Sequence, residues 1–353
     1  MSNALKVIVL GTGRMGAGII TLVREKRGLE LAGVYARRPR AEPTDVGDAI
    51  GLGERIGLEV SNDLQALLTR AAPSVAIQAT CSRVAEAMDE IRLLLRHGVN
   101  VVSIAEEMIY PACSSPRLAE EIHALAIAND ASVLGTGINP GFVLDFLIVT
   151  LTGVCQRVES ITAKRVNDLS PYGATVLKSQ GVGLTADAFA SGVADGSVVG
   201  HVGFPESIAM MANAIGWDID RVEETREPIV SGVERETSTI TVAPGRVAGC
   251  LHTAIAYRGD TPVITLIHPQ QVRPELEGVT TGDYIDIRGD PGVKLSGSPE
   301  IPGGVATAAL AVNVIPHVVN AEAGLRTMAE LPVPASFCGD VRRLIAERSR
   351  GCA

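Results

Sequence analysis

The stretch from Leu5 to Gly18 constrains the fold of this chain more than any other part of the sequence. Its short apolar run ends directly in a Gly-x-Gly-x-x-Gly loop that continues into helix-forming residues. In such a loop the glycines allow a tight turn and the close approach of a pyrophosphate, which the free N–H groups of the helix bind. The stretch predicts a dinucleotide site, and a purely structural glycine turn is the alternative. The predicted contacts are Gly11, Thr12, Gly13, Arg14, Met15 and Gly16.

Length, composition and charge narrow the class of protein. A chain of 353 residues exceeds one ordinary core, so we expect two domains, and 46% hydrophobic with 20% charged residues is typical of a globular protein. The formal charge of −9, with no basic block, argues against a nucleic-acid partner. The N-terminal apolar run is too short for a signal peptide or a bilayer span, so we expect a cytoplasmic protein without a membrane partner.

The six cysteines are scattered along the chain without any C-x-x-C pair. Zinc sites and disulfide frameworks depend on recurrent cysteine spacings, so neither is expected here. We predict reduced thiols and no metal site.

Residues 1–145 are predicted to form a doubly wound parallel sheet of the Rossmann type, because strand and helix patterns alternate along them. The second strand, Leu29–Tyr35, occupies the place that normally ends in an acid for the ribose 2′-OH. This chain instead has Arg37 and Arg38 there. Two guanidiniums suit a 2′-phosphate, so we expect NADP as the preferred cofactor and NAD as the second candidate. The alternative is that both arginines are solvated loop residues.

Another strand end carries small polar side chains at the edge where parallel sheets bind ligands. The strand Ser74–Thr80 is followed by Ser82, which we expect to cap the next helix. Thr80 and Ser82 are therefore further candidates for cofactor contacts.

The strand Asn100–Ile104 is followed closely by two adjacent carboxylates, Glu106 and Glu107. Neighbouring side chains at a strand end diverge, so we expect one toward the nicotinamide and the other in a salt bridge or at a helix start. In this fold the ligands bind at the carboxyl ends of the strands, so this position favours a catalytic role for one of the two glutamates. The alternative is an acid-rich helix start stabilised by the helix dipole.

The glycine-rich turn Gly135–Phe142 follows the next strand and should form the hinge to the second domain. Asn139 in this turn is a candidate contact to a substrate or a carboxamide. A purely conformational role for the turn is the alternative.

Residues 146–300 are predicted to form an α+β domain with an open mixed sheet. The stretch Ser160–Asn167 has a period of two, which puts Arg165 and Asn167 on one face, where they could fork a carboxylate or simply be solvated. The segment Ser170–Gly200 is rich in Gly, Ser and Asp and is expected to be irregular or a mobile lid. Four later strands are expected, at Glu236–Val242, Val247–Tyr257, Pro262–His268 and Tyr284–Ile287. His268 ends the third, where a lone histidine is more often structural than catalytic.

Residues 301–353 are predicted to be a C-terminal helical segment that returns to the first domain. Pro302–Pro316 is apolar with small residues on one side, which suits tight packing. Thr307 lies in its first turns and is a candidate for the cleft.

The glycine loop, the strand end Val101–Glu107, the turn Gly135–Gly141 and the arrangement of the C-terminal half resemble the 2,4-diaminopentanoate dehydrogenase family, which includes native NAD(P)-dependent amine dehydrogenases. The resemblance covers essentially the whole chain. A more distant resemblance to dihydrodipicolinate reductases stops at the first domain, since their paired histidines and Lys-x-Asp-x-Pro-Ser-Gly-Thr run are missing here. The family's catalytic carboxylate falls in the Glu106–Glu107 pair. Its substrate-binding set falls on Asn139, Arg165, Asn167, His268 and Thr307.

The resemblance implies reversible oxidative deamination of an amine or a diamino acid to a ketone and ammonia, with NAD(P) as hydride acceptor. In reverse the reaction is the reductive amination of a ketone or aldehyde. A carboxylate suits it, because it can hold an ammonium and take its proton. We further expect a homodimer.

Three other functions are weighed against this one. The first two are an NAD(P)H-dependent reductase of a cyclic imine and a semialdehyde-type dehydrogenase, and the latter needs a reactive cysteine for which Cys81 is the candidate. The third, a redox-sensing regulator, is disfavoured because it leaves Glu106–Glu107 and Arg165–Asn167 without a purpose.

Overall fold

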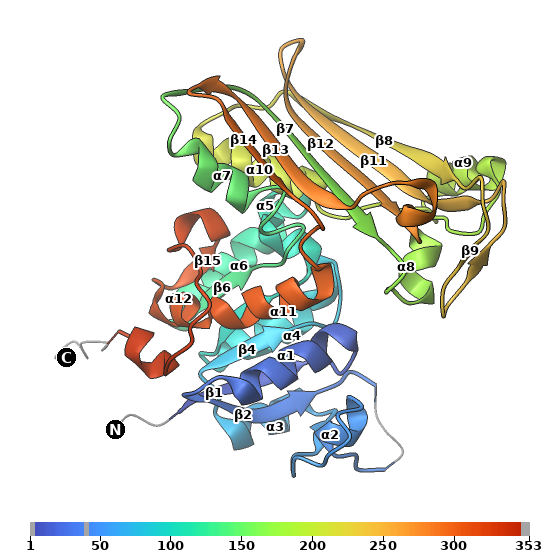
Figure 1. Cartoon of the computed structure of the whole chain (residues 1–353). Helices are drawn as coiled ribbons and strands as arrows, with labels where there is room; N and C mark the ends of the chain where they lie inside the picture. The colour runs from blue at the N-terminus through green and yellow to red at the C-terminus, as the bar shows by residue number, and fades with distance from the viewer. Residues whose placement is uncertain (1–3, 39–41, 347–353) are drawn as a thin grey trace. The chain divides into compact units, whose positions relative to one another are not determined.

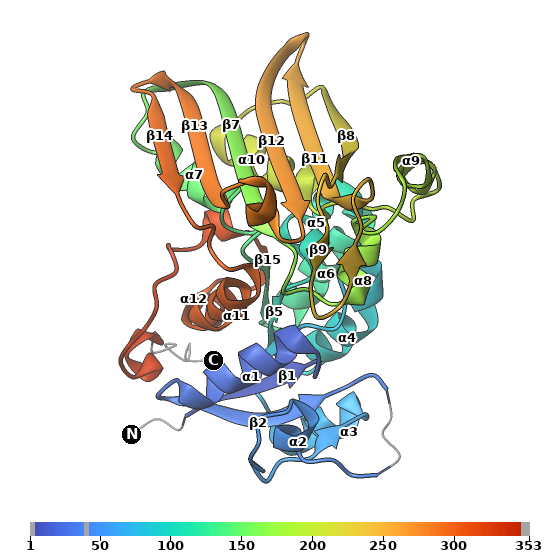
Figure 2. The same cartoon turned by 45° about the vertical axis from the view of Figure 1, so that its right-hand side comes forward.

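The computed structural model describes residues 4–38 and 42–346. The chain divides into two compact units, each with a sheet of its own (Figures 1 and 2). Unit 1 comprises residues 1–141 and 303–353, and unit 2 comprises residues 142–302.

Unit 1 is built on a seven-stranded sheet in which every neighbouring pair of strands is parallel. In spatial order the strands are β15 (Gly324–Arg326), β6 (Ser132–Gly135), β5 (Asn100–Ser103), β4 (Val75–Gln78), β1 (Leu5–Leu10), β2 (Leu29–Tyr35) and β3 (Val60–Ser61). The α-helices are α1 (Arg14–Glu25), α2 (Val46–Ala49), α3 (Leu64–Ala71), α4 (Val84–Arg96), α5 (Pro111–Ser114), α6 (Pro116–Ala128), α11 (Gly303–Asn313) and α12 (Ile315–Asn320). The described residues of this unit also form three short 3-10 helices, η1 (Glu106–Ile109), η3 (Met328–Glu330) and η4 (Val341–Leu344). The Rossmann-type fold predicted from the alternation is confirmed.

Helices cover both faces of this sheet. Leu67 of α3, Ile91 of α4 and Ile122 of α6 belong to one core cluster on one face, and each such buried aliphatic side chain contributes about 1.5–3 kcal/mol. On the other side α1 and α11 lie side by side (Figure 1). Gly18 and Ala308 permit this close approach, because a Cβ on Gly18 would stand 3.5 Å from the Ala308 methyl.

The segment Gly303–Asn320, which contains α11 and α12, is long and apolar enough to cross a membrane by length and composition alone. In the structure it contacts other parts of unit 1, since α11 packs against α1 and α12 packs against β5 and β6. These contacts account for its apolar character as a helix layer of the sheet.

Unit 2 carries a six-stranded mixed sheet, as predicted. In spatial order the strands are β14 (Val293–Gly297), β13 (Gly282–Asp290), β7 (Arg157–Asp168), β12 (Thr261–Gln271), β11 (Val247–Arg258) and β8 (Arg221–Val230). Only β7 and β12 pair in parallel, and the other neighbours are antiparallel. The helices are α7 (Phe146–Thr152), α8 (Ala174–Ser179), α9 (Ala186–Asp195), α10 (Phe204–Ile215) and the 3-10 helix η2 (Pro274–Glu277).

Two local expectations for unit 2 are wrong. The strand expected at Glu236–Val242 is a hairpin of β9 (Arg235–Glu236) and β10 (Thr241–Val242), because the Thr237 hydroxyl accepts the N–H groups of Thr239 and Ile240 and closes a turn between them.

The second error is Ser170–Gly200, which contains α8 and α9 rather than irregular chain. Thr185 caps α9 through Ala188 N, and Phe189 is buried against Val198 and Cys250. The cap and one buried aromatic ring order a segment whose Gly and Ser content predicted a loop.

Candidate active site

The glycine loop between β1 and α1 has the geometry of an anion site. A Cβ on Gly11 would stand 2.5 Å from Ala79 O, just after β4, and one on Gly16 would stand 2.0 Å from Gly11 O, so neither position has room for a side chain. At Gly13 nothing lies within 4 Å of the Cβ position, which leaves room for a ligand. The first turn of α1 has no acidic residue and no side-chain cap on its N–H groups. The residues present therefore fit a dinucleotide pyrophosphate at the positive end of this helix.

Glu107 and Glu106 begin η1, and their carboxylates have different partners. Glu107 Oε2 accepts the N–H of Val84 at 2.9 Å, and its Oε1 lies 3.9 Å from Arg83 Nη1. Glu106 instead accepts a hydrogen bond from the Ser82 hydroxyl. Burial raises the pKa of the Glu106 carboxyl, and the negative charge of Glu107 adds to the rise. The structure thus uses Glu107 at the start of α4 and leaves Glu106 as a desolvated carboxylate.

The expectation that Ser82 caps α4 is wrong. The N-cap is Arg83, which makes no side-chain capping bond, and Val84 N donates to Glu107. Ser82 is free for Glu106 because a residue distant in sequence closes the helix.

The amide atoms Nδ2 and Oδ1 of the half-buried Asn139 are both buried, and neither has a hydrogen-bond partner among the described residues. A buried amide left unpaired costs about 1–3 kcal/mol, which favours a ligand as its partner. The turn that carries it is tied to α11, since Ile138 N donates to the Thr307 hydroxyl at 3.2 Å. Asn139 and Thr307, far apart in sequence, are thereby brought together in unit 1.

Arg165, Asn167 and His268 come together in unit 2, on β7 and β12. The Arg165 guanidinium donates to Asp283 Oδ1 at 2.6 Å and to Ile301 O at 2.5 Å, so its charge is already offset. His268 Nδ1 lies 2.7 Å from Arg165 O, and burial lowers the pKa of His268 to about 3, with the Arg165 charge adding to this. Asn167 Oδ1 is buried and has no partner in the described part of the chain.

No sequence pattern pointed to His201, which belongs to the same cluster. Its ring lies 5.0 Å from that of His268 and 4.7 Å from that of Phe204, and its Nε2 is buried with no partner among residues 4–38 and 42–346. Its backbone N–H donates to His252 Nδ1, and His252 Nε2 pairs with Glu224. His201 directly follows the segment Ser170–Gly200 that was predicted to be irregular, and no periodicity marks it. His252 could have been found, because it faces His268 in the register of two predicted strands.

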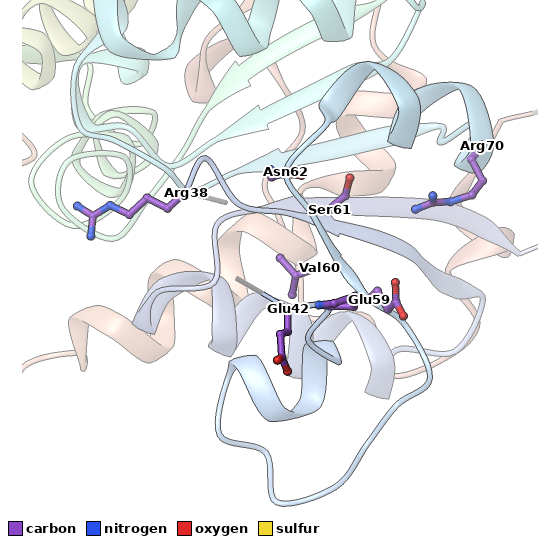
Figure 3. Close-up of a pocket in the computed structure, with 8 residues that line it drawn as sticks. Arg38, Glu42, Glu59, Val60, Ser61, Asn62 and Arg70 are labelled. Carbon is purple, nitrogen blue, oxygen red and sulfur yellow. The ribbon is translucent and has the colours of Figure 1, made fainter. Parts of the chain in front are cut away.

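Arg37 and Arg38, predicted at the end of β2, differ in their surroundings. Arg37 Nε donates to Glu90 Oε1 at 2.7 Å, and its Nη2 donates to Glu86 O. Arg38 is exposed and borders a hollow of about 310 Å³ that is lined by Arg38, Glu42, Pro43, Glu59, Val60, Ser61, Asn62 and Arg70. Figure 3 shows its side chain directed away from Ser61. Charges of both signs line this hollow, so the hollow is not an anion site in itself.

Comparison with known proteins decides the family. The model of the 2,4-diaminopentanoate dehydrogenase C-terminal domain matches residues 142–347, and that of the dihydrodipicolinate reductase N-terminus matches residues 5–104. The chain is 43% identical over 349 residues to the 2,4-diaminopentanoate dehydrogenase of Acetoanaerobium sticklandii. The alignment covers 98% of each of the two chains. The chain belongs to the 2,4-diaminopentanoate dehydrogenase family.

Two further relatives extend this family toward amine dehydrogenases. The amine dehydrogenase of Streptomyces virginiae is 25% identical over 351 residues, covering 93% of this chain and 96% of that one. The solved structure of the amine dehydrogenase from Mycobacterium smegmatis is 27% identical, covers 94% of this chain and 97% of that chain, and superposes with a TM-score of 0.82. The resemblance predicted from the motifs is confirmed, and the chain is an oxidoreductase. The likeness to dihydrodipicolinate reductases covers less of the chain, since their N-terminal family model matches residues 5–104.

Proposed function

We propose that this chain is a nicotinamide-dependent amine dehydrogenase that oxidises a primary amine or diamino acid to the ketone and ammonia, and that runs in reverse as a reductive aminase. The observation that carries this proposal is the division of roles between the adjacent glutamates. Glu107 accepts the backbone N–H at the start of α4, whereas Glu106 is a desolvated carboxylate that accepts the Ser82 hydroxyl and its own backbone N–H. The relatives that share the family point to the same chemistry.

The cofactor is proposed to bind with its pyrophosphate on the glycine loop and to be NADP in preference to NAD. The open Cβ position at Gly13 and the uncapped start of α1 support the first point, and Arg37 and Arg38 after β2 support the second. A bound nicotinamide would supply the hydride acceptor for the α-carbon of the amine.

Glu106 is proposed to hold the substrate nitrogen and to move its proton. The raised pKa brings the carboxyl closer to the working pH, where a general base is most effective. When ionised, its oxygens stabilise an ammonium or a developing iminium, and they can take a proton from the amine or from an attacking water. Asn139, whose side-chain amide has no hydrogen-bond partner in the described part of the chain, is proposed to orient either the substrate or the carboxamide of the cofactor.

The polar end of the substrate is proposed to be recognised in unit 2. Asn167 Oδ1 and His201 Nε2 are buried without a partner in the described chain, and Arg165 and His268 lie in the same cluster. Such a group of donors and acceptors suits a carboxylate or the second amine of a diamino acid. Thr307 in unit 1 is proposed as a further contact.

The protein is proposed to be a homodimer in the cytoplasm. A hollow of about 470 Å³ lies on the face of the unit 2 sheet that carries Lys164 and Val166, opposite to the face of Arg165 and Asn167. Much of its lining is apolar, which suits a second copy of the chain. The described cysteines are all unpaired, as expected in a reducing compartment. Light scattering should give twice the mass of the chain, and a monomeric mass would contradict the dimer.

The test of the proposed activity is the oxidation of NADPH with a small ketone or a γ-keto acid, measured with and without ammonia. Ammonia-dependent oxidation that yields the amine supports the proposal. Oxidation that needs no ammonia points to a simple carbonyl reductase, and turnover of a cyclic imine alone points to the reductase alternative. A protein that binds NADPH but turns over none of these substrates would favour the regulatory alternative.

A further inference from the structure

A buried acid pairs with Arg37, the arginine that follows β2. Glu90 of α4 is 6% exposed, and its two carboxylate oxygens have different partners. Oε1 accepts a hydrogen bond from Arg37 Nε at 2.7 Å, and Oε2 accepts one from the Thr80 hydroxyl at 2.5 Å. Glu90 therefore links the end of β2 to the end of β4, at the edge where the cofactor is proposed to bind.

The partners of Glu90 are themselves fixed. Gln78 Nε2 donates to the Thr80 hydroxyl at 2.7 Å, and the Ser103 hydroxyl donates to Gln78 Oε1 at 2.5 Å. Arg37 Nη2 is held by the backbone oxygen of Glu86 at 2.7 Å. These two contacts hold the guanidinium of Arg37 in place, while the Arg37 side chain remains 38% exposed.

We propose that Glu90 sets the cofactor preference of this enzyme, by offsetting the charge of Arg37 so that NAD(H) is accepted beside NADP(H). This inference rests on the proposed nicotinamide site. In other dinucleotide domains an acid at the end of the second strand hydrogen-bonds the ribose 2′-OH directly. Glu90 instead acts through Arg37, because both of its carboxylate oxygens already accept hydrogen bonds from the protein.

The charges decide the direction of the effect. A phosphate monoester carries about −1.5 to −2 at neutral pH, whereas the ribose 2′-OH of NAD(H) is neutral. A guanidinium paired with a carboxylate attracts the phosphate less than a guanidinium alone, because the acid repels it from behind. The remaining N–H groups of Arg37 can still donate to a hydroxyl, so binding of NAD(H) is little affected.

The experiment compares the affinities of NADPH and NADH by fluorescence titration at one ionic strength. In Glu90→Gln we expect the preference for NADPH over NADH to rise by about tenfold relative to the parent protein. In Arg37→Gln, which leaves the carboxylate of Glu90 facing the ribose, we expect the preference to move toward NADH. Glu86→Gln is the matched control, since it removes an exposed acid one turn away on α4 and keeps the backbone oxygen that holds Arg37.

The inference is overturned if the ratio of affinities is unchanged in Glu90→Gln, or if Glu86→Gln changes it as much. A merely structural role would weaken both dinucleotides together and leave the ratio where it was. If Glu90→Gln does not fold, the opposite shift in Arg37→Gln and a parent-like ratio in Glu90→Asp decide the question. A parent protein that binds neither dinucleotide would instead refute the proposed function.

Discussion

The carboxylate of Glu107 accepts the backbone N–H of Val84 at 2.9 Å, so the second of two adjacent glutamates closes the start of α4. This bond replaces the side-chain cap that Arg83 does not provide. Glu106, its neighbour, is left with the Ser82 hydroxyl and a raised pKa.

Replacing Glu107 should cost stability. Loss of a carboxylate that caps a helix start typically destabilises a protein by about 0.5–2 kcal/mol, so Glu107→Ala should lower the free energy of unfolding by that amount. Urea unfolding measures it. Glu120→Ala, an exposed acid on α6, is the control and should change little. Equal stabilities of the two variants would show that the contact with Val84 does not stabilise α4.

Glu106→Gln, unlike Glu107→Ala, should raise the stability of the protein, and the size of the gain should depend on pH. Since the pKa of Glu106 is raised above its ordinary value of 4.5, the folded state binds the proton more tightly than the unfolded state. The ionised carboxylate therefore lowers stability at pH values above its folded pKa, and glutamine removes this cost. We expect a higher Tm for Glu106→Gln than for the parent protein at pH 8, with the gain disappearing below about pH 4.5. A lower Tm at pH 8, or a difference that is independent of pH, would contradict the burial of a charged Glu106.

The arginines after β2 should favour NADP(H). A charge-assisted bond to phosphate contributes about 1.5–3 kcal/mol, so Arg38→Ala should weaken NADP(H) by roughly tenfold to a hundredfold. Arg37→Ala should weaken NADP(H) by less, because Glu90 already offsets the charge of Arg37. Their effect on NAD(H) should be small. Titration of both cofactors against each variant checks this, and equal losses for NADP(H) and NAD(H) would refute the assignment.

Arg165 is predicted to recognise the polar end of the substrate even though it is paired with Asp283. Arg165→Met alone leaves a buried acid unpaired and should cost about 3–5 kcal/mol, so the informative variant is Arg165→Met with Asp283→Asn. In that double variant the preference for a γ-keto acid over a plain alkyl ketone should fall. Steady-state rates with a matched pair of substrates measure the preference. An unchanged ratio would show that Arg165 supports the sheet and does not bind substrate.

The parts of this molecule that follow local patterns could be predicted from the sequence. The Gly-x-Gly-x-x-Gly pattern of residues 11–16 can be recognised from the sequence alone, and so can the period of two that places Arg165 and Asn167 on one face of β7. The order of strands and helices in residues 1–145 depends on the same short-range patterns. This is why the Rossmann-type sheet was predictable.

The parts that depend on distant partners could not be predicted. Glu106 and Glu107 have the same side chain, and contacts with Ser82, Arg83 and Val84 distinguish them. Arg165 gives no sign in the sequence of its pairing with Asp283, 118 positions away. The buried Nε2 of His201 likewise follows from its tertiary neighbours, since no periodicity surrounds it.

The most direct test of the account is the chemical step in Glu106→Gln and Glu107→Gln, each measured by steady-state amine oxidation beside a titration of NADP(H). Proton transfer by a positioned group contributes about 10²–10⁴-fold, so Glu106→Gln should lower kcat by at least about a hundredfold with nearly intact cofactor binding. Glu107→Gln should keep a kcat close to that of the parent protein. A near-normal kcat in Glu106→Gln would contradict the carboxylate mechanism, and a loss confined to Glu107→Gln would reverse the assignment of the two glutamates.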